Sequence, residues 1–236
     1  MMRCGSVAAR VAASGGSPTF LGTHADLSSE ANVSSLTSDS WAVSGSNRFL
    51  LAFLGSGAGT PANPSSVKWG GFGGTSFTQQ GSTLTVGSAG KFSMFSLVAP
   101  TAQTSTSYYL WPSAQDETAA GTVAFTGVNQ STPLGTVATS TGNGVTTLSP
   151  SINVASAAGD LVVGACWFVD QSGNNRAITA SGGTVIYDVD VGAYEFLLVQ
   201  SVVATGATTT LTFDISGGGG GANQVDWGLF GVALKQ

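Results

Sequence analysis

Hydrophobic and polar residues alternate in several short segments of the chain. In the segment TTTLTFDI, which ends at Ile215, large apolar residues alternate with threonine and aspartate. A period of two places one set on a buried face and the other in water, as in a half-buried β-strand. The segments RFLLAFLG (48–55) and DLVVGACWFV (160–169) are instead apolar at nearly every position. They predict strands covered on both faces, either by the other half of the chain or by another subunit.

The same patterns predict about seven strands in each half of the chain, separated by Gly, Pro, Asn and Ser. In the first half we expect strands near 40–44, 48–54, 66–70, 75–79, 91–99, 105–111 and 120–128. In the second half we expect them near 151–155, 160–168, 176–180, 184–188, 193–204, 207–215 and 225–234. No segment shows helical periodicity. The predicted fold is therefore all-β, an antiparallel β-sandwich with jelly-roll-like character.

The chain also resembles itself. Four segments recur in the same order, among them GGTSF (ending at Phe77) as GGTVI (ending at Ile186), and SLVAPTAQTSTSYYLW as SVVATGATTTLTFDI. This order predicts two degenerate sequence repeats, at 31–134 and 135–236, preceded by an arm or peripheral strand at 1–30. The pattern leaves open whether the repeats form two separate sandwiches or one fused body.

Composition narrows the possible functions. Only 8% of the 236 residues are charged while 42% are hydrophobic, which excludes a disordered chain and predicts a nearly neutral surface. The net charge of −5 argues against a nucleic-acid partner. No segment is long and apolar enough for a membrane span, and Arg10 interrupts the N-terminal segment where a signal peptide would be apolar.

Histidine and cysteine are too scarce for zinc or nucleophilic chemistry. His24 is the single histidine, with no nucleophile motif beside it, and is interpreted as an exposed loop residue. Cys4 and Cys166 are far apart and expected to be free thiols, with Cys166 in the core.

The acidic residues and glycines carry no recognisable site motif either. Asp116–Glu117 and the pair Asp188 and Asp190 lack calcium-loop spacing and are interpreted as solvated carboxylates. The glycine run at 217–221 lacks the lysine and helix of a phosphate-binding loop. We therefore predict no catalytic residue, no metal and no cofactor, and we do not expect an enzyme; a hydrolase is the weakest alternative.

Two aromatic residues are candidate contact residues. Trp69 and Phe72 lie among glycines in KWGGFGG, where an exposed ring could stack on a sugar or anchor a partner protein. Packing beneath a loop is the favoured interpretation, and the contact role is the alternative. The tryptophans at 41, 111, 167 and 227 fall in predicted strands and are expected in the core.

The segments SGSNRFLLAFLGSG, VKWGGFGGTSF, FSLVAP, GTVAFTGVNQSTPLG and WGLFGVALKQ resemble β-sandwich structural proteins of tailed phages. The resemblance covers residues 45–236 and rests on strands and turns, so it transfers no active-site residue. It implies a virion component assembled in the host cytoplasm, a capsid decoration (cement) protein or a tail or fibre component. Its implied partners are the major capsid protein or other virion proteins, and further copies of the chain in a homo-oligomer. The alternative is a carbohydrate- or receptor-binding module of a tail fibre or cell surface.

Sheet edges suggest how such a protein would assemble. The chain has only three lysines, and most predicted strands contain none. Lysine and proline at edges normally prevent strands of different molecules from pairing. We therefore expect the exposed strands to be covered in an assembly, with the segment 1–30 as a candidate clamp.

Overall fold

The computed structural model describes residues 16–57, 59–88, 90–146, 148–170, 176–191, 195–216 and 225–236. Within these ranges the chain forms nineteen strands in antiparallel sheets and no helix, which confirms the predicted all-β sandwich class. The described residues accordingly contain no helix that could cross a membrane.

The first half of the molecule is a sandwich of a large and a small sheet. The large sheet has the order β1-β11-β4-β8-β7, the small sheet the order β2-β10-β5-β6, and a separate pair joins β3 and β9. The strands are β1 (Thr19–Ser29), β2 (Val33–Thr37), β3 (Trp41–Val43), β4 (Phe49–Gly57), β5 (Ser66–Trp69), β6 (Thr75–Ser76), β7 (Thr78–Val86), β8 (Gly90–Val98), β9 (Gln103–Ser105), β10 (Ser107–Gln115) and β11 (Glu117–Thr126).

The second half is also a sandwich of two sheets. Its large sheet has the order β12-β19-β14-β17-β16 and its small sheet the order β13-β18-β15. The strands are β12 (Ala138–Val145), β13 (Ser151–Ala155), β14 (Leu161–Asp170), β15 (Ala177–Ser181), β16 (Thr184–Val191), β17 (Glu195–Val203), β18 (Thr208–Ser216) and β19 (Val225–Leu234).

The two halves share one strand order. When the short strands β3, β6 and β9 are set aside, the first strand of each half lies beside the last, and the remaining strands correspond in turn. This shared order is what a sequence repeat would produce. The duplication itself and the jelly-roll description stay predictions.

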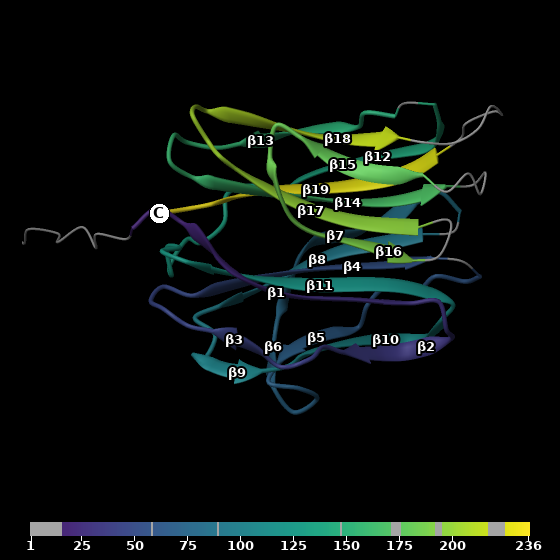
Figure 1. Ribbon diagram of the computed structural model, residues 1–236, viewed down its shortest axis with the longest axis horizontal. Helices are drawn as coiled ribbons and strands as arrows, with labels where there is room; N and C mark the ends of the chain where they lie inside the picture. Colours follow the sequence, from purple (N-terminus) through teal and green to yellow (C-terminus); the bar gives the residue numbers. More distant parts are fainter. Residues whose placement is uncertain are drawn as a thin grey trace, which may run out of the picture.

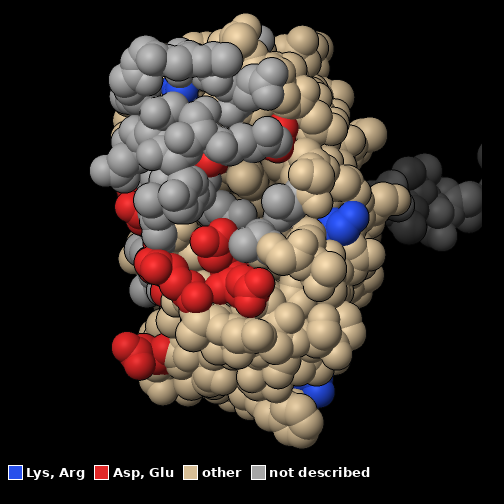
Figure 2. All heavy atoms as spheres, turned by 90° about the vertical axis from the view of Figure 1, so that its right-hand side faces the viewer, with Lys and Arg blue, Asp and Glu red and all other residues tan. Residues whose placement is uncertain are grey.

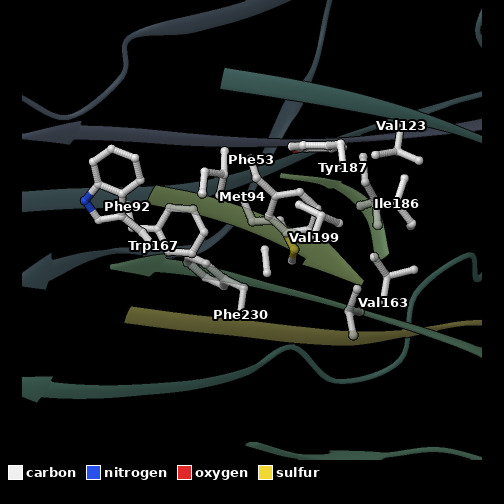
Figure 3. Close-up of a cluster of buried hydrophobic side chains, with 14 of the residues drawn as sticks. Phe53, Phe92, Met94, Val123, Val163, Trp167, Ile186, Tyr187, Val199 and Phe230 are labelled. Atoms are coloured by element: carbon white, nitrogen blue, oxygen red, sulfur yellow. The ribbon is translucent and has the colours of Figure 1, made fainter. Parts of the chain in front are cut away.

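The two sandwiches stack through their large sheets into a four-layer body (Figure 1). Side chains from both halves fill the space between the two large sheets and form the central core, which includes Phe53 and Phe92 of the first half and Trp167 and Phe230 of the second (Figure 3). Each half also has one core cluster of its own, between its large sheet and its small sheet. The question left open by the sequence is thus answered: the halves form one fused body.

This stacking explains the segments that are apolar at nearly every position. All nine residues of β4 are buried. Phe49, Leu51 and Phe53 point into the central core, whereas Leu50 and Leu54 point toward the small sheet of the first half. The ten residues of β14 are buried in the same alternating way. Because the other half covers these strands, they offer no apolar face to another subunit, and of the two predicted coverings the one by the other half is correct.

Glycines of one half receive large side chains of the other. A Cβ built on Gly55 of β4 would lie 2.2 Å from the indole of Trp167 in β14. A Cβ on Gly121 of β11 would lie 2.2 Å from the ring of Tyr187 in β16. In the reverse direction, a Cβ on Gly228 of β19 would lie 2.7 Å from Val86 in β7. The large sheets therefore interlock rather than simply touch.

Several sequence-based boundaries need correction. Residues 19–29, for which an arm and a peripheral strand were the alternatives, form edge strand β1 of the first sandwich, which agrees with the peripheral strand. The ring centroids of Phe20 in β1 and Phe125 in β11 lie 6.2 Å apart. The first sandwich therefore begins before residue 31. Strands β2 and β12 and most of β7 and β9 were not predicted, since polar residues and glycine dominate them. The dipeptide Asn143–Gly144 is a turn signal in the sequence, but it lies within β12 at an irregularity of its pairing.

The segments 55–64 and 113–120 of the first half and 171–175 and 217–223 of the second follow equivalent predicted strands, so we expect them as loops at corresponding ends of the two halves. The strands that flank them, β4, β10, β14 and β18, all end at the right-hand end of the molecule in Figure 1. The segments 171–175 and 217–224 themselves lie outside the described residues, as does Cys4.

Candidate functional site

The outer face of the small sheet in the first half carries a row of polar and aromatic residues. Lys68 of β5 pairs with Tyr108 of β10, which in turn pairs with Thr37 of β2. On the other side, Lys68 pairs with Ser76 of β6. Residues directly opposite in antiparallel strands have side chains on the same face. The neighbours Val67, Trp69 and Tyr109 are buried, so this row points away from the core.

The loop between β5 and β6 places Phe72 above this row. The Gly74 N–H donates to the Gly71 carbonyl at 3.0 Å, which closes a four-residue turn with Phe72 at its second position. The Gly70 and Gly71 N–H groups both donate to the Thr106 carbonyl, at 3.0 and 3.2 Å. The φ angles of Gly70 and Gly71 are +100° and +77°, which residues with a Cβ rarely adopt. The glycines thus permit a tight loop that hydrogen bonds fix to the sheet.

Phe72 is the most exposed of the large hydrophobic residues in the described part of the chain, at 69%. Its ring meets that of Tyr108 edge to face, with centroids 5.4 Å apart and an interplanar angle of 90°. The Lys68 ammonium lies 5.0 Å from the centroid of the Phe72 ring and donates a 2.8 Å hydrogen bond to the Phe72 carbonyl. We name Phe72, Tyr108 and Lys68 the aromatic corner.

Trp69, the other predicted contact residue, does not belong to this surface. It is 1% exposed, packs against Trp41 with ring centroids 4.9 Å apart, and donates from Nε1 to the Thr101 carbonyl. Trp69 therefore packs beneath the loop, the favoured of its two interpretations, and is not available as a contact residue, because the alternation in β5 turns this side chain inward and Lys68 outward. The tryptophans at 41, 111, 167 and 227 are buried, as predicted.

Among the described residues of the second half, the equivalent outer face carries no aromatic corner. There the corresponding row consists of Ser151, Thr212 and Ser181 on β13, β18 and β15. The turn that follows β15 is only Gly182–Gly183 before β16 begins. A sandwich of this strand order therefore forms without aromatic residues on its outer sheet.

Acidic side chains gather on the end of the molecule that Figure 2 shows. Asp188 and Asp190 occupy exposed positions of β16. Burial, and then the negative charges of Glu30 and Asp188, raise the pKa of Asp190 above its ordinary value. Asp116, in the hairpin between β10 and β11, is exposed. Among the described residues no three His, Cys, Asp or Glu side chains are placed to hold a metal ion.

The remaining candidates lie in strands. His24 belongs to β1 and pairs with Val123 of β11, so it is a strand residue and not the loop residue predicted. Cys166 is a free, fully buried thiol in β14, as predicted, and burial raises its pKa far above its ordinary value.

A groove of about 450 Å³ lies where β7 and β8 meet the connection between the halves. Its lining contains no titratable group, and therefore offers no acid, base or charged ligand for catalysis; the lining residues are Thr78, Gln80, Ser96, Leu97, Val98, Pro133 and Leu134.

In comparisons with known proteins, no family model, no curated protein and no solved structure matches this chain. The resemblance to phage structural proteins therefore stays a proposal.

Sequence reasoning identified Phe72 but missed its two partners. The signal was present in the alternation of SVKW and SYYLW, where Lys68 and Tyr108 lie between residues that belong in the core. What the sequence did not contain was the pairing of β5 with β10, which brings these two side chains together.

Proposed function

We propose that the protein is a structural component of a tailed-phage virion, most specifically a decoration protein on the capsid. The observation that carries the proposal is the four-layer stack, in which two sandwiches share one continuous core and form a single body. Interlocked side chains make such a body stiff, and its few charges keep the desolvation cost of covering its surface low. The sequence resemblance supports the same assignment.

The contacts with the capsid would come from outer sheets, edges and loops, since the large sheets are already covered. Strands β13 and β15 are the edges of the small sheet in the second half, and neither contains a charged residue. An uncharged edge is available for pairing with another chain, including a second copy. A stable interface buries about 1,600 Å², and repetition over a lattice strengthens weak single contacts.

The test is the composition of purified particles. Mass spectrometry of gradient-purified virions should find the chain in a fixed ratio to the major capsid protein, and capsids separated from tails should retain it. Absence of the chain from purified particles would refute the virion role. Presence on isolated tails alone would refute the capsid assignment.

The N-terminal segment 1–15, the part of the predicted arm that is tested by deletion, can be examined in the same particles. Deleting residues 1–15 leaves β1 intact, because that strand begins at Thr19. We expect unchanged thermal unfolding of the purified protein and reduced occupancy on virions. Unchanged occupancy would show that residues 1–15 do not contribute to attachment of the protein to the virion.

The second candidate is a carbohydrate- or receptor-binding module, and the observation that favours it is the exposed ring of Phe72. Trp69 no longer contributes to this candidate, since it is buried.

A further inference from the structure

We propose that the aromatic corner is a carbohydrate-binding site that receives the pyranose ring of a surface glycan or polysaccharide. This deepens the second candidate function above and does not depend on the virion role. The outer sheet of the second half is an internal control for that of the first, because the two halves share one strand order.

The fold does not require the aromatic corner. At the corresponding row of the second half, Thr212 and Ser181 stand where the first half has Tyr108 and Lys68. Phe72 has no counterpart there, since the turn consists of two glycines. Leaving 69% of a phenylalanine in water also contributes little hydrophobic stabilisation. Stability therefore does not explain the corner, and recognition does.

The corner is preorganised for binding. The loop that carries Phe72 is held by backbone bonds to Thr106, by the bond across the turn, and by the Lys68 bond to the Phe72 carbonyl. Tyr108 is half-buried in the sheet, and its ring stands perpendicular to that of Phe72. Little conformational entropy remains to be lost when a ligand binds, which favours affinity from a small contact area.

The chemistry of the corner matches a sugar ring. The negative face of an aromatic ring attracts the weakly positive C–H groups that line one face of a pyranose. In the row beneath the ring, the Tyr108 and Thr37 hydroxyls can donate hydrogen bonds to sugar hydroxyls or accept them, and the Lys68 ammonium can donate them. Ser76, opposite Lys68, extends this polar border.

The small exposed apolar area of the corner favours a sugar over a protein as its ligand. The corner presents one phenylalanine and part of one tyrosine, surrounded by Ser, Thr and Lys. A stable protein interface needs about 800 Å² on each partner with an apolar centre. One ring with a polar border suits a single sugar unit, and several copies of the protein on one surface would add their weak affinities.

The experiment uses the full chain, biotinylated and clustered on streptavidin, on an array of neutral and uronic-acid glycans. Four proteins are compared: the wild type, Phe72→Ala, Tyr108→Phe and Val203→Ala. Val203 is 61% exposed and lies on β17 of the second half, so its truncation is the matched control for removing an exposed apolar side chain. Binding to neutral glycans would show recognition of the sugar ring, whereas binding to uronic-acid glycans alone would show that the carboxylate of the sugar is required.

We expect the wild type and Val203→Ala to bind at least one pyranose-containing glycan equally, and Phe72→Ala to lose that signal at least tenfold. Tyr108→Phe keeps the ring and removes the hydroxyl, and should weaken binding less than Phe72→Ala does. Phe72→Ala should keep the wild-type melting temperature, because the side chain is exposed.

Wild-type protein that binds no glycan in either group overturns the proposal, as does binding that Phe72→Ala leaves unchanged. If Phe72→Ala instead reduces virion occupancy while the wild type binds no glycan, the corner is a protein contact and the carbohydrate assignment is wrong. The composition of purified virions is a separate measurement, so the carbohydrate proposal can fail while the virion role is retained, and the reverse.

Discussion

Replacing Gly55 by alanine should force a methyl group into the interface between the two halves. The new Cβ would lie 2.2, 2.4 and 2.5 Å from three atoms of the Trp167 indole, whereas ordinary contact begins near 3.4 Å. The indole would have to retreat by more than about 1 Å, but Trp167 is fully buried in the central core among residues such as Phe92 and Phe230 (Figure 3). Overpacking of this kind costs about 1–3 kcal/mol.

The matched control is Gly206→Ala in the connection between β17 and β18. A Cβ at Gly206 meets nothing within 4 Å, and its φ is not in the left-handed region. Alanine there should be neutral or stabilise by about 0.4–1 kcal/mol, through the entropy of the unfolded chain. The two glycine-to-alanine changes therefore have opposite expected signs.

The assay is urea unfolding followed by far-ultraviolet circular dichroism, which does not depend on the fluorescence of Trp167. A double-mutant cycle with Trp167→Leu isolates the contact: the smaller side chain makes room for the methyl group, so the penalty of Gly55→Ala should fall by about 1–3 kcal/mol in that background. If Gly55→Ala is as stable as Gly206→Ala, or if its penalty persists beside Leu at position 167, the interlocking described for the two sheets is wrong.

Three further outcomes are expected. Leu51→Ala and Val163→Ala, both fully buried in the central core, should each lower the free energy of unfolding by about 2–4 kcal/mol in urea titration; values below about 0.5 kcal/mol would contradict that packing. Burial raises the pKa of Tyr109 to about 12, so the stability that this tyrosine contributes should be complete below about pH 10 and fall as the pH rises toward 12. The Tyr109→Phe variant should lose less stability between pH 10 and 12 than the wild type. An equal loss in both proteins would show that ionisation of Tyr109 does not cause the alkaline loss of stability. In a Cys4→Ser variant, Cys166 should react with a thiol reagent only after denaturation, and rapid reaction of the native protein would show that β14 is accessible.

Some features follow from the sequence because they depend on local periodicity. Alternation in TTTLTFDI predicts β18 with one face buried, and its pattern of burial agrees. The apolar run RFLLAFLG predicts a strand covered on both faces, and β4 is such a strand. Strands rich in Ser, Thr and Gly, such as β12, escape prediction because their side chains carry little hydrophobic contrast between the two faces.

Only the tertiary structure decides what lies opposite each face. The sequence states that β4 has two apolar sides, but not that one meets the second half, where Gly55 receives Trp167. It also places Trp69 and Phe72 in the same glycine-rich segment, yet the strand turns one into the core while the loop lifts the other into water. Periodicity specifies the direction of a side chain, whereas its neighbours come from segments tens to hundreds of residues away, which pack together only in the folded chain.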